Sequence, residues 1–237
     1  MKKILFVILS CVFAAANAQP VDEVIQKYAT AMGGLESFKK IATAKFTGVL
    51  TTQGNSLPLT TQIINGKAMR TDVNVNGQEV TNAYNNGKGW KINPITGGTT
   101  ATEATAAELV WFKAQASLAN NLMDYQSRGH LVELQGKEDV EGSNTFRIKL
   151  TSKDDGKVTA YFIDSTSYML LKSITKRVIA GSEYDTETFY SNIKEIMGLK
   201  FCMNFIQKIE GKVLQSVVYE KIELNISVDK KIFEIPK

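Results

Sequence analysis

The feature that most constrains the fold of this chain is an alternation of apolar and polar residues that recurs from residue 42 to residue 226. A period of two is typical of β-strands that bury one face. It is clearest over residues 146–151, where every second residue is a large hydrophobic one. Turn pairs such as Asn76-Gly77 and Glu210-Gly211 separate the strands and favour antiparallel hairpins. The pattern therefore predicts about ten strands in consecutive hairpins.

A sheet of this size curls as its twist accumulates, and it must bury one face against helices. We therefore predict an α+β fold: a large curved antiparallel sheet, or half-barrel, with helices packed in its concave face. The space between the sheet and the helices should be apolar, and it is either filled or left as a cavity. The expected strands lie at residues 69–73, 80–84, 90–92, 146–151, 158–163, 169–178, 183–192, 201–209 and 213–226.

Two segments have a helical pattern instead. Residues 20–40 place Val21, Val24, Ile25, Tyr28 and Met32 on one face, and the Gly33-Gly34 pair should end that helix before a short further turn. Residues 102–125 are rich in Ala, Leu, Glu and Lys and contain no Gly or Pro, which predicts a helix or a pair of helices. Residues 97–100 should form the flexible connection before it.

The N-terminus has the pattern of a secretory signal peptide. Lys2 and Lys3 precede a short apolar stretch, and Ala16-Asn17-Ala18 forms a small-x-small cleavage site. We expect residues 1–18 to be removed and residues 19–237 to form one exported domain. Two alternatives are an uncleaved membrane anchor and lipid attachment at Cys11, because residues 8–11 resemble a bacterial lipobox.

Charge and cysteine usage exclude several classes of protein. Loss of Lys2 and Lys3 lowers the formal net charge of +4 to +2, which is no signature of nucleic-acid binding. Loss of Cys11 leaves Cys202 without an intrachain partner, so the core must supply the stability. We expect Cys202 to be a buried thiol that acts as a small hydrophobic residue.

Catalytic chemistry has few candidates here. His130 is the one histidine, no G-x-S-x-G motif accompanies it, and we expect it at the surface or at a sheet edge. One His and one Cys cannot build a zinc site, and no calcium loop or phosphate-binding glycine motif is present. Residues 154–157 are interpreted as a hairpin turn. We therefore predict no catalytic residues, no metal and no cofactor.

The large apolar side chains favour binding over catalysis. They are candidates to line a pocket, with simple filling of the core as the alternative. These candidates are Met69, Tyr84, Trp90, Trp111, Phe112, Met123 and Phe162.

Short motifs along the chain resemble LolA-like periplasmic proteins, the outer-membrane lipoprotein-sorting superfamily, and above all the branch common in Bacteroidetes-type bacteria. These motifs are residues 28–34 followed by Thr47-Gly48, the basic strand at 67–70, residues 86–94 around Trp90, the strand-to-strand segment 161–170, and the ending at 222–225 and 229–236. One departure is Asn-Asn-Gly at 85–87, where the carriers usually have Asp-Gly.

The resemblance implies a LolA/LolB-like half-barrel that holds acyl chains in its concavity and carries them between membranes without a nucleotide. Residues 102–125 would be the lid, packing against Trp90 and Met69, which adds Leu109 to the candidate ligand contacts. Arg70, in the basic strand at 67–70, is a further candidate. The implied partners are a lipid or an acylated lipoprotein and envelope membrane proteins, and the expected protein is a periplasmic monomer. The alternatives are an adaptor module with a filled core that binds another envelope protein, and an enzyme.

Overall fold

A computed structural model of the protein describes residues 20–179 and 181–236, so the predicted signal peptide and Cys11 lie outside the described residues. The strands are β1 (Thr43–Thr52), β2 (Asn55–Ile64), β3 (Ala68–Val75), β4 (Gln78–Asn85), β5 (Lys88–Asn93), β6 (Gly98–Glu103), β7 (Leu131–Val140), β8 (Ser143–Thr151), β9 (Val158–Asp164), β10 (Leu170–Ile179), β11 (Ser182–Ile196), β12 (Leu199–Ile209) and β13 (Lys212–Leu224). The helices are α1 (Val21–Ala31), α2 (Leu35–Lys40), α3 (Ala106–Gln115), α4 (Tyr125–Arg128) and the short 3₁₀ turns η1 (Pro94–Thr96) and η2 (Lys230–Phe233).

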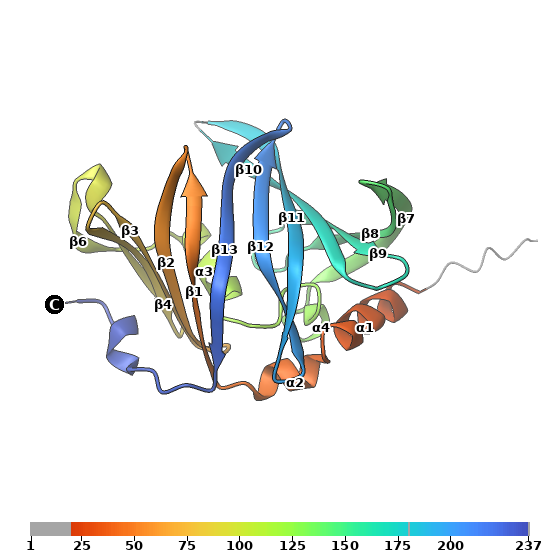
Figure 1. The fold of residues 1–237 in the computed structure, drawn as a ribbon, viewed down its shortest axis with the longest axis horizontal. Coiled ribbons are helices and arrows are strands. Elements are labelled where there is room, and N and C mark those ends of the chain that lie inside the picture. The colour runs from red at the N-terminus through yellow and green to blue at the C-terminus, as the bar shows by residue number, and fades with distance from the viewer. Residues whose placement is uncertain (1–19, 180, 237) are drawn as a thin grey trace, which may run out of the picture.

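The described strands form one sheet of thirteen, in the order β6-β5-β4-β3-β2-β1-β13-β12-β11-β10-β9-β8-β7. Every neighbouring pair is antiparallel. All pairs are consecutive in the chain except β1 and β13, which bring the two ends of the strand series together. The sheet curls around α3, which lies behind β1 and β13 in Figure 1. We call the side that faces α3 the inner face and the opposite side the outer face.

This architecture confirms the predicted curved antiparallel sheet with helices in its concavity. The sheet has thirteen strands rather than about ten, because the ranges assigned from the sequence omit β1 and β2, which lie in the alternating region after residue 42, and the two edge strands, β6 and β7. β6 is polar and largely exposed, whereas β7 alternates over only part of its length, where Val132 and Leu134 are partly buried. The hairpin turns at Asn76-Gly77, Glu210-Gly211 and residues 154–157 lie where they were expected.

The N-terminal helical segment is divided as predicted. Gly33 adopts a φ of +110°, and a Cβ atom there would lie 2.4 Å from the carbonyl oxygen of Gly198. The close approach lets the Lys200 N–H donate to the Met32 carbonyl at 2.8 Å. Gly33 thus both ends α1 and docks it on the β11–β12 turn.

The predicted helix at residues 102–125 is wrong at both ends. Residues 98–103 belong to β6, α3 begins only after Thr105, and turns follow it from residue 116. Thr105 and Glu108 form a capping box that fixes the start of α3, with the Glu108 N–H donating to Thr105 Oγ1. The expected flexible connection at 97–100 is instead Gly97 in the left-handed conformation followed by β6. In the described part of the chain, no helix has the length and hydrophobicity needed to cross a membrane.

Candidate ligand-binding cavity

The inner face is hollow between the sheet and the segment that runs from α3 to Met123. Two chambers of about 750 and 420 Å³ lie there, within the size range of small-molecule pockets. Thr61, Gln115, Phe205 and Tyr219 line both chambers, so the two are adjacent.

One half of the larger chamber is apolar. Leu57, Leu50, Val217 and Phe205 lie opposite one another on β2, β1, β13 and β12, and so form a row across the inner face. Val110 and Trp111 of α3 close this row from the other side. Trp111 is 48% exposed although it lines the cavity, so its indole is available to a ligand. This half can bury a hydrocarbon chain.

The other half of the larger chamber is polar. Thr159, Thr175 and Thr186 lie opposite one another on β9, β10 and β11, with Thr188 beside them on β11. Gln207 and Gln215 continue the wall onto β12 and β13, and the Gln215 amide donates to Gln207 Oε1 at 2.9 Å. The cavity therefore changes from hydrocarbon to hydroxyl and amide along its length.

The smaller chamber is closed by Tyr28 of α1, by Met32, which directly follows α1, and by Phe38 of α2. The Asn120 amide donates to the Tyr28 hydroxyl at 2.7 Å, and Tyr190 shares a hydrogen bond with Ser173 at 2.8 Å. Burial raises the pKa of Tyr190 to about 12, so its phenol stays neutral. These groups give the chamber neutral aromatic walls, and its lining also includes Lys200.

Close packing on the sheet holds α3 above the cavity. A Cβ atom at Gly89 would lie 2.8 Å from Leu109 and 3.1 Å from Phe112, so only glycine lets the helix approach this closely. Phe112 is 1% exposed, and Lys91 pairs with Glu108 at 2.5 Å. The helix is thus anchored at its first turn and along the face that carries Phe112.

Asn65, which the sequence analysis did not single out, fixes the end of α3. Its amide donates to the carbonyls of Phe38 and Ile41 at 2.8 and 2.9 Å, and its Oδ1 accepts from the Leu118 N–H at 3.0 Å. One side chain therefore joins α2, the β2–β3 turn and the segment after α3. The only local signal was Asn65-Gly66, a turn pair between strands, and such a pair gives no indication of these distant contacts.

The structure places the predicted ligand contacts in three groups. Trp111 and Met123 line the cavity. Met69, Tyr84, Leu109 and Phe112 lie in the core between the inner face and α3 and line neither chamber. The third group comprises Arg70, Trp90 and Phe162.

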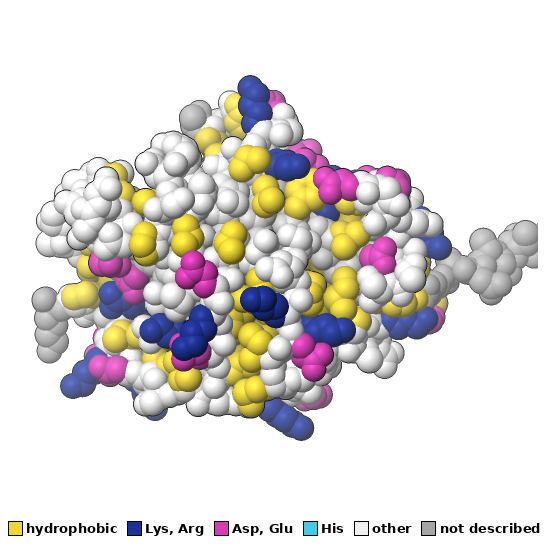
Figure 2. Space-filling view, viewed as in Figure 1, with side chains coloured by type: hydrophobic (Ala, Val, Ile, Leu, Met, Phe, Trp, Pro, Cys, Tyr) yellow, Lys and Arg dark blue, Asp and Glu magenta, His cyan; other side chains and the backbone are white. Residues whose placement is uncertain are grey.

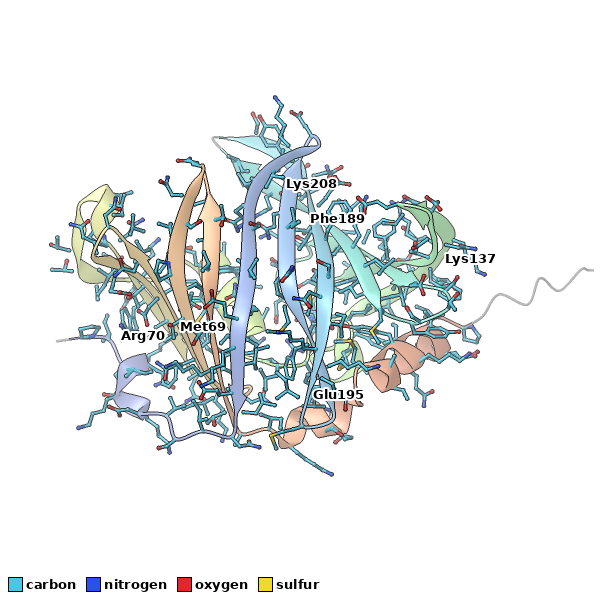
Figure 3. The ribbon with its side chains drawn as sticks, viewed as in Figure 1. Met69, Arg70, Lys137, Phe189, Glu195 and Lys208 are labelled. Atoms are coloured by element: carbon cyan, nitrogen blue, oxygen red, sulfur yellow. The ribbon has the colours of Figure 1, made fainter. Side chains whose placement is uncertain are left out.

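Arg70, Trp90 and Phe162 lie on the outer face. Arg70 directly follows Met69 on β3, so strand alternation places their side chains on opposite faces of the sheet. Both residues are labelled in Figure 3. The Arg70 guanidinium stacks over Trp90 at 5.6 Å, and the Trp90 Nε1–H donates to the Phe233 carbonyl of η2 at 3.0 Å. The predicted packing of the lid against Trp90 is therefore wrong, because the sheet separates Trp90 from α3. Ligand binding by the inner-face residues remains a prediction.

The outer face of the sheet is mixed in character. Figure 2 shows its hydrophobic side chains as separate islands between charged and other polar groups. Lysines cover several of its aromatic rings, as where the Lys208 ammonium lies 4.4 Å from the Phe189 ring centroid (Figure 3). The continuous apolar surface is on the inner face.

His130 and Cys202 have structural environments. His130 directly precedes edge strand β7 but is 6% exposed, so it is buried rather than at the surface; its Nδ1 accepts from the Lys153 N–H at 3.1 Å. Cys202 is partly buried, and its thiol lies 3.1 and 3.0 Å from the carbonyls of Ser191 and Asn204. Burial raises the pKa of Cys202 to about 11, which keeps the thiol protonated and unreactive. Within residues 20–179 and 181–236, no three His, Cys, Asp or Glu side chains gather as a metal site.

The buried imidazole predicts a pH dependence of stability. Burial, followed by the charge of Arg128, lowers the pKa of His130 in the folded protein. The unfolded chain therefore binds the proton first, so this contribution to stability is complete above about pH 6.5 and is lost as the pH falls below that value. Melting temperatures measured at descending pH should show this loss, and His130→Gln should reduce it. An identical pH profile for the variant would contradict the prediction.

Comparison with known proteins shows which solved structures share this fold. No protein-family model and no curated protein matches the sequence. Among solved structures, a LolA superfamily protein from Nitrosomonas europaea matches with a TM-score of 0.61 at 12% identity, covering 90% of this chain and 96% of that one. The chain has a LolA-like fold.

Two further structures agree with this fold. An outer membrane lipoprotein-sorting protein domain from Vibrio parahaemolyticus matches with a TM-score of 0.60 at 10% identity, over 90% of this chain and 97% of that one. A DUF1329 family protein from Desulfovibrio piger matches with a TM-score of 0.59 at 13% identity, over 91% and 97%. The resemblance read from the sequence motifs is confirmed at the level of the fold, whereas the Bacteroidetes-type branch remains a prediction.

Proposed function

We propose that this LolA-like protein is an exported binder or carrier of an acyl-chain ligand, and that it works in the periplasm as a monomer formed by residues 19–237. The observation that supports this most directly is the apolar row of the inner face, which a half-exposed Trp111 overhangs. A ligand in this cavity needs few polar contacts, because each buried methylene contributes about 0.8 kcal/mol. The proposed role is binding rather than catalysis, with a lipid or an acylated lipoprotein as the ligand and envelope membrane proteins as its partners.

Leu57→Arg tests this function. Leu57 is partly buried at the end of the apolar row, so a guanidinium there would place a charge where the hydrocarbon is proposed to lie. We expect saturable binding of a fluorescent fatty acid by the wild type and at least tenfold weaker binding by the variant. Fluorescence titration measures both.

Val218→Arg is the matched control, because Val218 is 42% exposed on the outer face of β13 and lines neither chamber. It should bind the probe like the wild type. Native mass spectrometry of protein purified gently from its own envelope should also retain a bound lipid. Absence of saturable binding together with absence of bound lipid would refute the carrier and favour the adaptor.

A further inference from the structure

The polar half of the larger chamber is built from neutral hydrogen-bonding side chains on adjacent strands. We define the polar wall as Thr159, Thr175, Thr186, Thr188, Gln207 and Gln215. The Thr159 hydroxyl donates to Thr175 Oγ1 at 3.4 Å, and Gln215 donates to Gln207 at 2.9 Å. Strand register aligns these residues on one surface beside the apolar row, since Val217 is two residues from Gln215 on β13.

One member of this wall has an unsatisfied polar atom. Thr186 is 1% exposed and lines the chamber, yet its Oγ1 has no hydrogen-bond partner in the structure. A buried hydroxyl without a partner is unfavourable, because it has lost its hydrogen bonds to water and gained none in the protein. Rotation of the Thr186 side chain toward the chamber that it lines would let a ligand atom complete this hydrogen bond.

The charges at the mouth of this half are largely paired. Lys157 lies 3.4 Å from Asp155, and Lys176 lies 2.7 Å from Glu183. Arg177 at the same mouth donates to Gln207 Oε1 at 3.4 Å. The two lysines are therefore paired with carboxylates, whereas Arg177 brings a positive charge to the edge of the polar wall.

We propose that the polar wall binds the uncharged polar head of an amphiphile, through its ester, amide or hydroxyl groups, while the acyl chain lies on the apolar row. This proposal rests on the proposed function and adds a ligand class to it. The donors of the wall match the ester or amide carbonyl of such a head, and the acceptors of the wall match its hydroxyl or amide N–H. A cationic head would have to leave water for a wall without a counter-charge, and an anionic head would find the Arg177 guanidinium only at the edge of the wall.

Displacement of bound phenylnaphthylamine by three amphiphiles with the same alkyl chain length tests the head group. We expect monolauroylglycerol to compete more strongly than dodecyl phosphate and dodecyltrimethylammonium. Preference for dodecyl phosphate would overturn the proposal in favour of an anion held by Arg177. Equal competition by all three would overturn it while leaving the acyl-chain carrier intact, and failure of all three to compete would refute both.

Thr186→Val removes the hydroxyl and keeps the shape of the side chain. Loss of one hydrogen bond should weaken monolauroylglycerol binding about two- to tenfold and leave dodecyltrimethylammonium unchanged. Thr60→Val is the matched control, because Thr60 alternates with cavity-lining Leu59 and Thr61 and so faces outward on β2. Equal affinity of the Thr186 variant and the wild type for monolauroylglycerol would overturn the assignment of Thr186.

Discussion

Trp90→Ala should lower the free energy of unfolding by about 3–5 kcal/mol without weakening the binding of an acyl-chain probe. Trp90 is 3% exposed and packs with Arg70 and η2 on the outer face, so truncation leaves a cavity there and removes its hydrogen bond to Phe233. The sheet separates this site from the ligand cavity. Chemical denaturation and a probe titration on the same sample measure the two effects.

Trp90→Phe is the control for the hydrogen bond. It keeps most of the apolar volume but removes the Nε1–H donor, so we expect a smaller loss of stability and unchanged binding of the probe. Weaker binding by Trp90→Ala at a temperature where it is fully folded would show that the outer face communicates with the cavity. It would also restore the prediction, made from the sequence, that Trp90 belongs to the ligand site.

The prediction that Trp90 packs against the lid was wrong, and it shows what period-two patterns can and cannot establish. Alternation shows that Met69 and Arg70 lie on opposite faces of one strand, but it does not say which face meets the helices. Both faces of β3 to β5 are buried here, one by α3 and the other by η2. A large apolar residue could therefore belong to either core, and the sequence-based assignment placed Trp90 and Phe162 on the wrong side.

The residues of the polar wall were not predicted from the sequence, for a related reason. Threonine is common in strands and occurs on solvent-exposed faces as well as on buried ones. In the sequence, Thr175 and Thr186 therefore resemble ordinary surface positions. Only the pairing of β10 with β11 aligns them on the inner face. The sheet and its hairpins follow from local turn chemistry and alternation, whereas the cavity depends on register between strands distant in sequence.

Phe112→Ala should be as destabilising as Trp90→Ala, by about 3–5 kcal/mol, but should also weaken probe binding. Phe112 is 1% exposed and packs against Gly89 on the inner face, and its neighbour Trp111 lines the cavity with a ring centroid 5.3 Å away. Truncation removes the main apolar anchor of α3, so the helix no longer holds Val110 and Trp111 over the apolar row.

Phe112→Met separates anchoring from ring chemistry, because it retains much of the volume and should cost less than about 1.5 kcal/mol. If α3 acts as the lid, probe affinity should follow the stability of its anchor: little changed in Phe112→Met, reduced in Phe112→Ala, and unchanged in the equally destabilised Trp90→Ala. Equal binding by all three folded variants would mean that α3 is a fixed wall whose anchoring does not govern access. The comparison at matched stability distinguishes a helix that merely covers the core from one that shapes the ligand site.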